Sequence, residues 1–202
     1  MPVFFIALLH VFFSGSFYGR ELIAPLGIGA LWFFPCCLLY ALFSDLIPSS
    51  FNSMPLYFSR TGRDLAFPLL FCLVFGIFTC RRRRGSAREL FLHLAAFFTG
   101  FFILFAQYVR LVFPAWYAEY IYFFLPLLWM SLTVCASFFV SLFFFCTGIT
   151  RFLFLVIPAC LPFAMGAVPL LYVMNYRGYA SLATIGFFAL SMILLWRFPP
   201  GE

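Results

Sequence analysis

The polar residues of this chain that could carry out chemistry are few, and they stand at the edges of long apolar runs. Arg110 and Arg177 carry guanidinium groups, which bind phosphate or carboxylate well. Asp64 or Glu119 could balance their charge, and Gln107 could add a hydrogen bond. These residues could form a shallow anion-binding site on one side of the protein. The favoured interpretation is a belt of interfacial residues in which arginines extend toward water.

A second candidate is the pair Glu89 and His93, which stand four residues apart and so share one helix face. Such a pair could form a proton relay or provide two metal ligands. A catalytic zinc usually needs three protein ligands, and His10, the only other histidine, is far away in sequence. For His10, which lies among phenylalanines, a packing role is favoured over a functional one. We predict no metal site and no cofactor.

No other spacing of potentially catalytic residues in the sequence favours an enzyme. The chain shows no convincing Ser/His/Asp, Cys/His or paired-carboxylate pattern, and it has no glycine-rich loop that would bind phosphate after a strand. An enzyme is therefore the least favoured class of function.

A basic run is the most conspicuous polar feature. Positive charge beside a membrane helix keeps its loop in the cytoplasm and contacts anionic lipids there. Docking of an acidic cytoplasmic partner is the alternative. Nucleic acid is excluded as a partner because the run offers few phosphate contacts and no aromatic platform. The run consists of Arg81, Arg82, Arg83, Arg84 and Arg88.

The amino-acid composition indicates the kind of protein in which these residues lie. Of the 202 residues, 66% are apolar and only 9% are charged, which excludes a water-soluble domain. The apolar runs do not alternate with polar residues, which excludes a β-barrel. The seven cysteines lie in or at the ends of apolar runs, so no disulfide framework is expected. The chain is predicted to be an all-α, polytopic integral membrane bundle.

Seven apolar segments are candidates for membrane-spanning helices, since about twenty residues cross the hydrocarbon layer. The first segment is short but lacks the basic start of a signal peptide, so six or seven helices are expected. The whole chain, residues 1–202, forms one transmembrane domain with no soluble domain. The candidate helices are residues 3–19, 22–43, 64–80, 89–109, 120–146, 152–174 and 179–196.

Arginine counting predicts the orientation. If the basic run is cytoplasmic, eight of the twelve arginines lie inside, the other three being Arg20, Arg151 and Arg197. The N-terminus is then outside and the C-terminus inside. The absence of glycosylation and retrieval signals favours a bacterial inner membrane.

Two predicted helices contain prolines, which remove a backbone donor and leave the carbonyl four residues earlier without its usual partner. In segment 152–174 the breaks recur every three or four residues and share one face. We expect segments 22–43 and 152–174 to be interrupted, as in transporter binding sites, although ordinary kinking is the simpler explanation. The residues concerned are Pro25, Pro35, Pro158, Pro162, Gly166 and Pro169.

Small residues predict where helices touch. Ala95, Ala96, Thr99 and Gly100 narrow one side of segment 89–109, which allows another helix to approach closely.

Three functions remain open from the sequence. The leading one is a non-catalytic integral membrane subunit or assembly factor, because the loops are short and the arginines suit docking. The second is a small-solute or lipid transporter that uses the interrupted helices. The third is an intramembrane enzyme acting on a lipid-linked substrate. The expected partners are the bilayer, anionic lipids at the basic run, and other membrane or cytoplasmic subunits.

Overall fold

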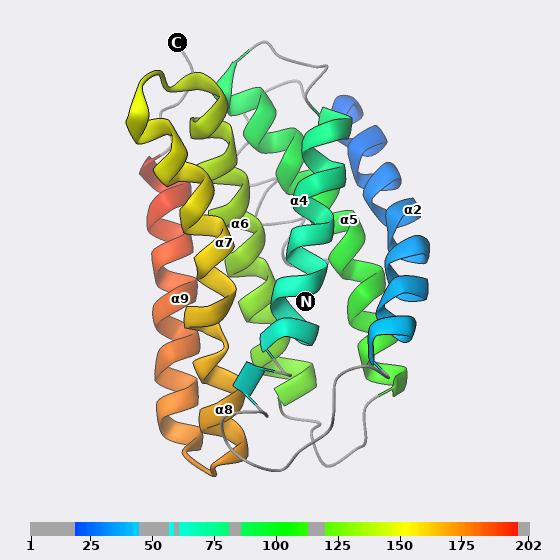
Figure 1. Ribbon diagram of the computed structural model, residues 1–202, viewed down its shortest axis with the longest axis vertical. Coiled ribbons are helices and arrows are strands. Elements are labelled where there is room, and N and C mark those ends of the chain that lie inside the picture. Colours follow the sequence, from blue (N-terminus) through cyan, green and yellow to red (C-terminus); the bar gives the residue numbers. More distant parts are fainter. Residues whose placement is uncertain (1–18, 45–56, 59–60, 81–85, 113–119, 198–202) are drawn as a thin grey trace.

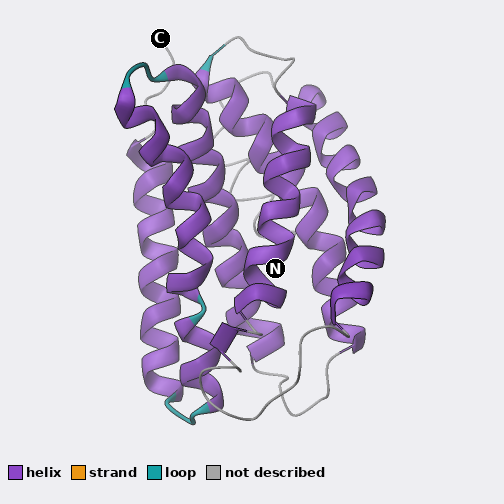
Figure 2. Ribbon diagram, in the orientation of Figure 1, coloured by secondary structure: helices purple, strands orange, loops and turns teal. Residues whose placement is uncertain are grey.

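The computed structural model describes residues 19–44, 57–58, 61–80, 86–112 and 120–197. Within these ranges the chain is almost entirely helical, with short loops and turns between helices, and contains no strand, as Figure 2 shows. The predicted all-α fold is thus confirmed. The seven cysteines are all free thiols.

Six helices are long and apolar enough to span a membrane, which supports a multi-pass membrane protein. Some of them begin or end with a turn of a different kind: η1 and η3 are π-helices and η4 is a 3₁₀ helix. The elements are α2 (Gly19–Ser44), η1 (Thr61–Ala66), α4 (Phe67–Cys80), α5 (Ala87–Val112), η3 (Tyr120–Phe124), α6 (Leu125–Phe145), η4 (Ile149–Phe152), α7 (Leu153–Met165), α8 (Ala167–Val173) and α9 (Arg177–Arg197). The predicted segment 3–19 lies outside the described residues.

Successive membrane helices run in opposite directions, so the connections gather at two ends of the bundle (Figure 1). We call the end where α4 stops and α5 begins the upper end; η4 and the last turn of α9 lie there too. At the lower end lie η1, η3, α8 and the start of α9. This alternation agrees with the predicted order of crossings.

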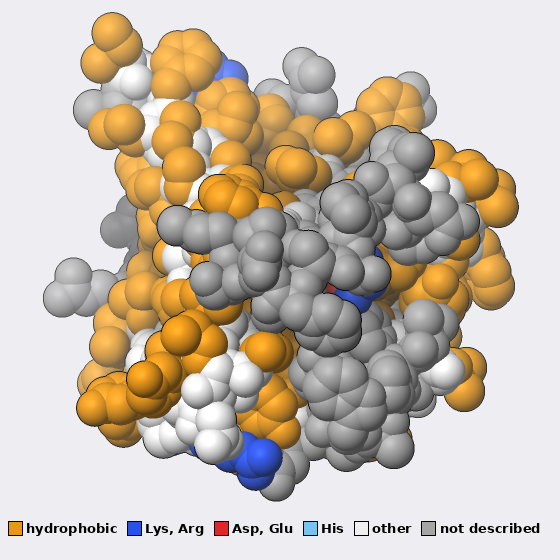
Figure 3. Space-filling model, turned by 60° about the horizontal axis from the view of Figure 1, so that its bottom comes forward, with side chains coloured by type: hydrophobic (Ala, Val, Ile, Leu, Met, Phe, Trp, Pro, Cys, Tyr) orange, Lys and Arg blue, Asp and Glu red, His pale blue; other side chains and the backbone are white. Residues whose placement is uncertain are grey.

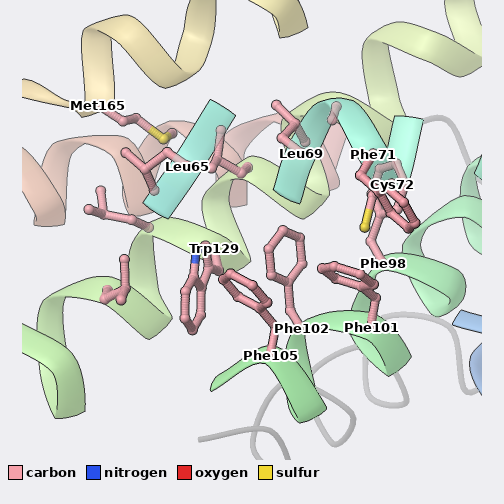
Figure 4. Packing of buried hydrophobic residues seen from close by; sticks show 14 of the residues in the cluster. Leu65, Leu69, Phe71, Cys72, Phe98, Phe101, Phe102, Phe105, Trp129 and Met165 are labelled. Atoms are coloured by element: carbon pink, nitrogen blue, oxygen red, sulfur yellow. The ribbon is translucent and has the colours of Figure 1, made fainter. Parts of the chain in front are cut away.

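The core is built on α5 and α6. In α5, 78% of the spanning window is buried, compared with 17% in α2, which lies at the edge of the bundle. Two phenylalanines of α5 pack against Trp129 of α6: Phe102 stacks on its ring with centroids 5.5 Å apart, and Phe105 meets it edge-on at 5.4 Å (Figure 4). Leu65 and Met165 bring η1 and α7 to the same cluster. Interlocking aromatic rings therefore hold the centre of the bundle together.

Two glycines allow α2 to contact α5 backbone to backbone. A Cβ atom on Gly29 would lie 2.0 Å from the carbonyl oxygen of Phe97, and one on Gly100 would lie 2.0 Å from that of Leu26. The predicted close approach at Gly100 is confirmed, and α2 is the helix that makes it. Since α2 is otherwise little buried, this glycine seam is its main attachment.

The expected interruption of segment 22–43 is wrong. Helix α2 runs unbroken for 26 residues with Pro25 and Pro35 inside it. The tight seam with α5 holds the backbone between the two prolines in a helical path, and a membrane helix tolerates the lost donors where its neighbours compensate.

Segment 152–174, in contrast, divides at Gly166 into α7 and α8. The three prolines on its predicted face, Pro158, Pro162 and Pro169, are buried, as is Gly166. A Cβ on Gly166 would lie 1.9 Å from Thr61 Oγ1, so the break packs directly on η1.

Candidate functional site

A buried carboxylate lies at the lower end, where η1 begins the third spanning segment. Asp64 is 1% exposed and its Oδ1 accepts a hydrogen bond from Arg63 Nε at 3.1 Å. The Tyr40 hydroxyl of α2 stands 3.5 Å from the same oxygen, and Trp129 Nε1 of α6 donates to the Asp64 backbone carbonyl at 3.0 Å. We call Tyr40, Arg63, Asp64 and Trp129 the Asp64 cluster. It draws three spanning helices to one carboxylate residue.

The local backbone is unusual at this point. η1 is a π-helix, a conformation that is rare and found frequently at functional sites. The second π-helix, η3, lies at the same end of the bundle (Figure 1). A carboxylate away from water is costly unless it is paired, and the Arg63 guanidinium provides such a partner for Asp64.

Aromatic rings extend the site toward α9. Tyr120 of η3 is buried, interacts electrostatically with Arg63, and packs on Tyr172 with centroids 5.8 Å apart. The guanidinium carbon of Arg177 lies 5.5 Å from the Tyr172 ring centre, which is within cation–π range. Figure 3 looks toward this end, and the described side chains that it shows are mostly hydrophobic, with a few charged atoms among them. Arg63 and Arg177 are thus linked by two tyrosines.

The helix break in α7–α8 lies beside this cluster. Thr61, three residues before Asp64, contacts Gly166, and its fully buried hydroxyl has no hydrogen-bond partner in the described part of the chain. Tyr57 donates a hydrogen bond to the carbonyl of Phe163, near the end of α7. The break and the buried ion pair therefore share one structural region.

The predicted anion site is only partly described. Asp64 and Arg177 lie at the same end, and Gln107 is exposed near the end of α5. The side chain of Arg110 and all of Glu119 lie outside the described part. The carboxylate of Asp64 pairs with Arg63, which the sequence did not single out.

Glu89 and His93 lie near the beginning of α5. His93 is buried and its Nδ1 lies 2.7 Å from the backbone carbonyl of Glu89, while the Glu89 N–H donates to Ser86 Oγ at 3.2 Å. Ser86 therefore caps α5. Within the described ranges no three His, Cys, Asp or Glu residues are grouped as metal ligands.

The remaining predicted residues concern the N-terminus and the basic run. His10 and residues 81–84 lie outside the described ranges. Arg88 is half-buried in the first turn of α5, at the upper end.

Only one of the cluster members that sequence reasoning missed, Arg63, has a signal in the sequence. Asp64 stands in an apolar segment and requires a partner, and Arg63 is its immediate neighbour. Nothing in the local sequence indicates Tyr40 or Trp129, which reach Asp64 from helices 24 and 65 residues away.

Comparison with known proteins finds no matching family model, no similar curated protein and no similar solved structure. The function is therefore inferred from the geometry of the site.

Proposed function

We propose that this chain is the membrane-embedded part of a transporter for a small solute or lipid that carries an anionic group, with the Asp64 cluster at its binding site. The observation that carries the proposal is the contact between a buried ion pair on a π-helical turn and the break between α7 and α8. Ionisable residues inside membrane proteins commonly mark substrate pathways, and interrupted helices commonly form transporter binding sites.

The charges favour an anion as the ligand. Among the side chains described at the lower end, Arg63 and Arg177 carry two positive charges and Asp64 one negative charge. Arg63 is 23% exposed, whereas Asp64 is 1% exposed, so an incoming solute meets the guanidinium first. A planar guanidinium binds phosphate or carboxylate in a bidentate way.

Binding would then change the pairing inside the cluster. An anion that draws Arg63 away leaves Asp64 with the hydroxyl of Tyr40 as a hydrogen-bond donor. A buried carboxylate that loses its ion pair becomes less stable, which favours movement of η1 against α7 at the Gly166 contact.

Transport is tested by reconstituting the purified chain in liposomes on a solid-supported membrane. The probes are inorganic phosphate, acetate, succinate and, as a neutral control, glucose. We expect a saturable current with at least one anion, no response to glucose, and loss of the current in Arg63→Gln. Absence of current with every anion, from a chain shown to be folded, would contradict the proposal.

A second candidate is a non-catalytic subunit of a larger membrane complex. The edge helices α2 and α9 favour it, because only 17% and 22% of their windows are buried in this chain. Other spanning helices could cover those faces. Co-purification in mild detergent tests this candidate: a chain that stays alone and folded would count against it.

For orientation we propose that the upper end is cytoplasmic in a bacterial inner membrane, with the N-terminus outside. The support is the basic run between α4 and α5. A protease that cuts this connection from outside intact cells would contradict the orientation.

A further inference from the structure

Arg151 occupies an unusual position at the upper end, in the short η4 turn between α6 and α7. Its guanidinium carbon lies 4.3 Å above the centre of the Phe143 ring. The Nε atom is buried and has no hydrogen-bond partner in the described ranges. No carboxylate in those ranges forms a salt bridge with Arg151, whereas Arg63 at the other end pairs with Asp64. Among the described side chains, none of opposite charge pairs with this guanidinium.

An arginine that simply extends into water would have its nitrogens hydrated. Here the ring of Phe143 covers one face of the guanidinium, and Nε is removed from water. A cation–π contact offsets only part of the cost of removing a charged group from water. The described residues supply no anion to this guanidinium, and a planar guanidinium is well suited to a phosphate.

The neighbours of Arg151 indicate where that phosphate comes from. Ile149 is 87% exposed, and Phe152 and Leu153, which follow Arg151, are exposed as well. Val156, one turn further along α7, also faces outward. A charged group beside an outward apolar stripe matches a phospholipid, whose head group is anionic and whose chains are apolar. Free phosphate would not make use of the stripe.

We propose that Arg151 and Phe143 form a binding site for the phosphate of an anionic phospholipid, whose acyl chains lie along the outward side of η4 and α7. Arg88, in the first turn of α5, lies at the same end of the bundle and adds positive charge there (Figure 1). This site is distinct from the Asp64 cluster at the lower end and does not depend on transport.

Lipid titration of the full chain, followed by native mass spectrometry, tests the proposal. The probes are phosphatidylglycerol and phosphatidylcholine with identical acyl chains. We expect the wild-type chain to prefer phosphatidylglycerol, and Arg151→Gln to weaken that binding roughly fivefold, since one arginine near a membrane surface contributes about 1 kcal/mol. Phosphatidylcholine binding should change little.

Arg88→Gln is the matched control, because it removes the same charge from the same end. A diffuse electrostatic effect would make the two variants equal, which would overturn the site. Equal binding of both lipids by the wild-type chain would overturn it too. Displacement of phosphatidylglycerol by millimolar inorganic phosphate would show a free-phosphate site instead.

A second variant keeps the test valid if Arg151→Gln fails to fold. Phe143→Leu retains the charge and removes the ring beneath it. We expect this variant to weaken phosphatidylglycerol binding about twofold to fivefold, the range of an exposed cation–π contact. Unchanged binding in a folded Phe143→Leu chain would refute the role of the ring and, with it, the proposed site.

Discussion

Replacing Gly29 with alanine should force α2 away from α5, whereas the same replacement at Gly27 should not. The new methyl group at position 29 would lie 2.0 Å from the Phe97 carbonyl oxygen, and ordinary contact begins near 3.4 Å. The helices must therefore separate locally by about 1.4 Å (3.4 − 2.0). The group that the methyl would meet is a backbone carbonyl, which cannot rotate aside as a side chain can. We therefore expect a loss of about 3 kcal/mol in unfolding free energy, the upper part of the range for overpacking.

Gly27 provides a control in the same helix. It is exposed, and a Cβ there meets nothing within 4 Å. Alanine at this position should leave stability unchanged or raise it slightly, because alanine favours helix over glycine. Gly100→Ala creates the same kind of clash from the α5 side. One separation relieves both clashes, so the Gly29→Ala/Gly100→Ala double variant should lose less than the sum of the single losses.

The assay is reversible unfolding in mixed micelles of mild detergent and dodecyl sulfate, monitored by circular dichroism. The expected order of stability is Gly27→Ala, equal to or above wild type, then Gly29→Ala well below. If Gly29→Ala and Gly27→Ala unfold at the same detergent fraction, the backbone contact between α2 and α5 is refuted.

Three further predictions concern single contacts and use the same assay. Removing Arg63 alone, as Arg63→Gln, should cost about 3 kcal/mol because it takes the guanidinium away from the buried Asp64 carboxylate; Arg63→Gln/Asp64→Asn should cost less, and additive losses would show that the two groups do not interact. Thr61→Val deletes a buried hydroxyl without a described partner, so stability should hold or rise by about 1 kcal/mol, and a clear loss would mean that the hydroxyl is bonded. Ser86→Ala removes the α5 cap and should cost about 1 kcal/mol, a loss that Ser86→Asp should largely prevent.

Much of the fold could be predicted from hydropathy alone. Every described spanning helix overlaps a predicted segment, because a lipid environment requires long apolar runs with satisfied backbones. The continuity of α2 could not be predicted, since it depends on the seam with α5. The positions of the prolines indicate which backbone N–H donors are missing. They do not indicate whether a neighbouring helix holds the backbone straight.

The candidate site was predictable only in part. Asp64 stands out because a charge inside an apolar segment demands an explanation. Its partners Tyr40 and Trp129 come from other helices, so their roles depend on packing that a single sequence does not encode locally. Arg151 was counted for orientation alone, because its missing counter-charge is visible only once the neighbouring side chains are placed.

The π-helical form of η1 bears on how this region tolerates changes in length. A π-helix accommodates more residues per turn than an α-helix, so η1 holds an excess of chain between Thr61 and α4. Deleting Gly62, where a Cβ would meet nothing within 4 Å, would let the segment relax to regular α-helix. Everything N-terminal to the deletion would then rotate by about 100° relative to α4, the angle per residue in an α-helix. Thr61 would turn away from Gly166, while Asp64 would stay in register with Trp129. A one-residue deletion would therefore uncouple the helix break at Gly166 from the Asp64 cluster, with the side chains of both left as they are.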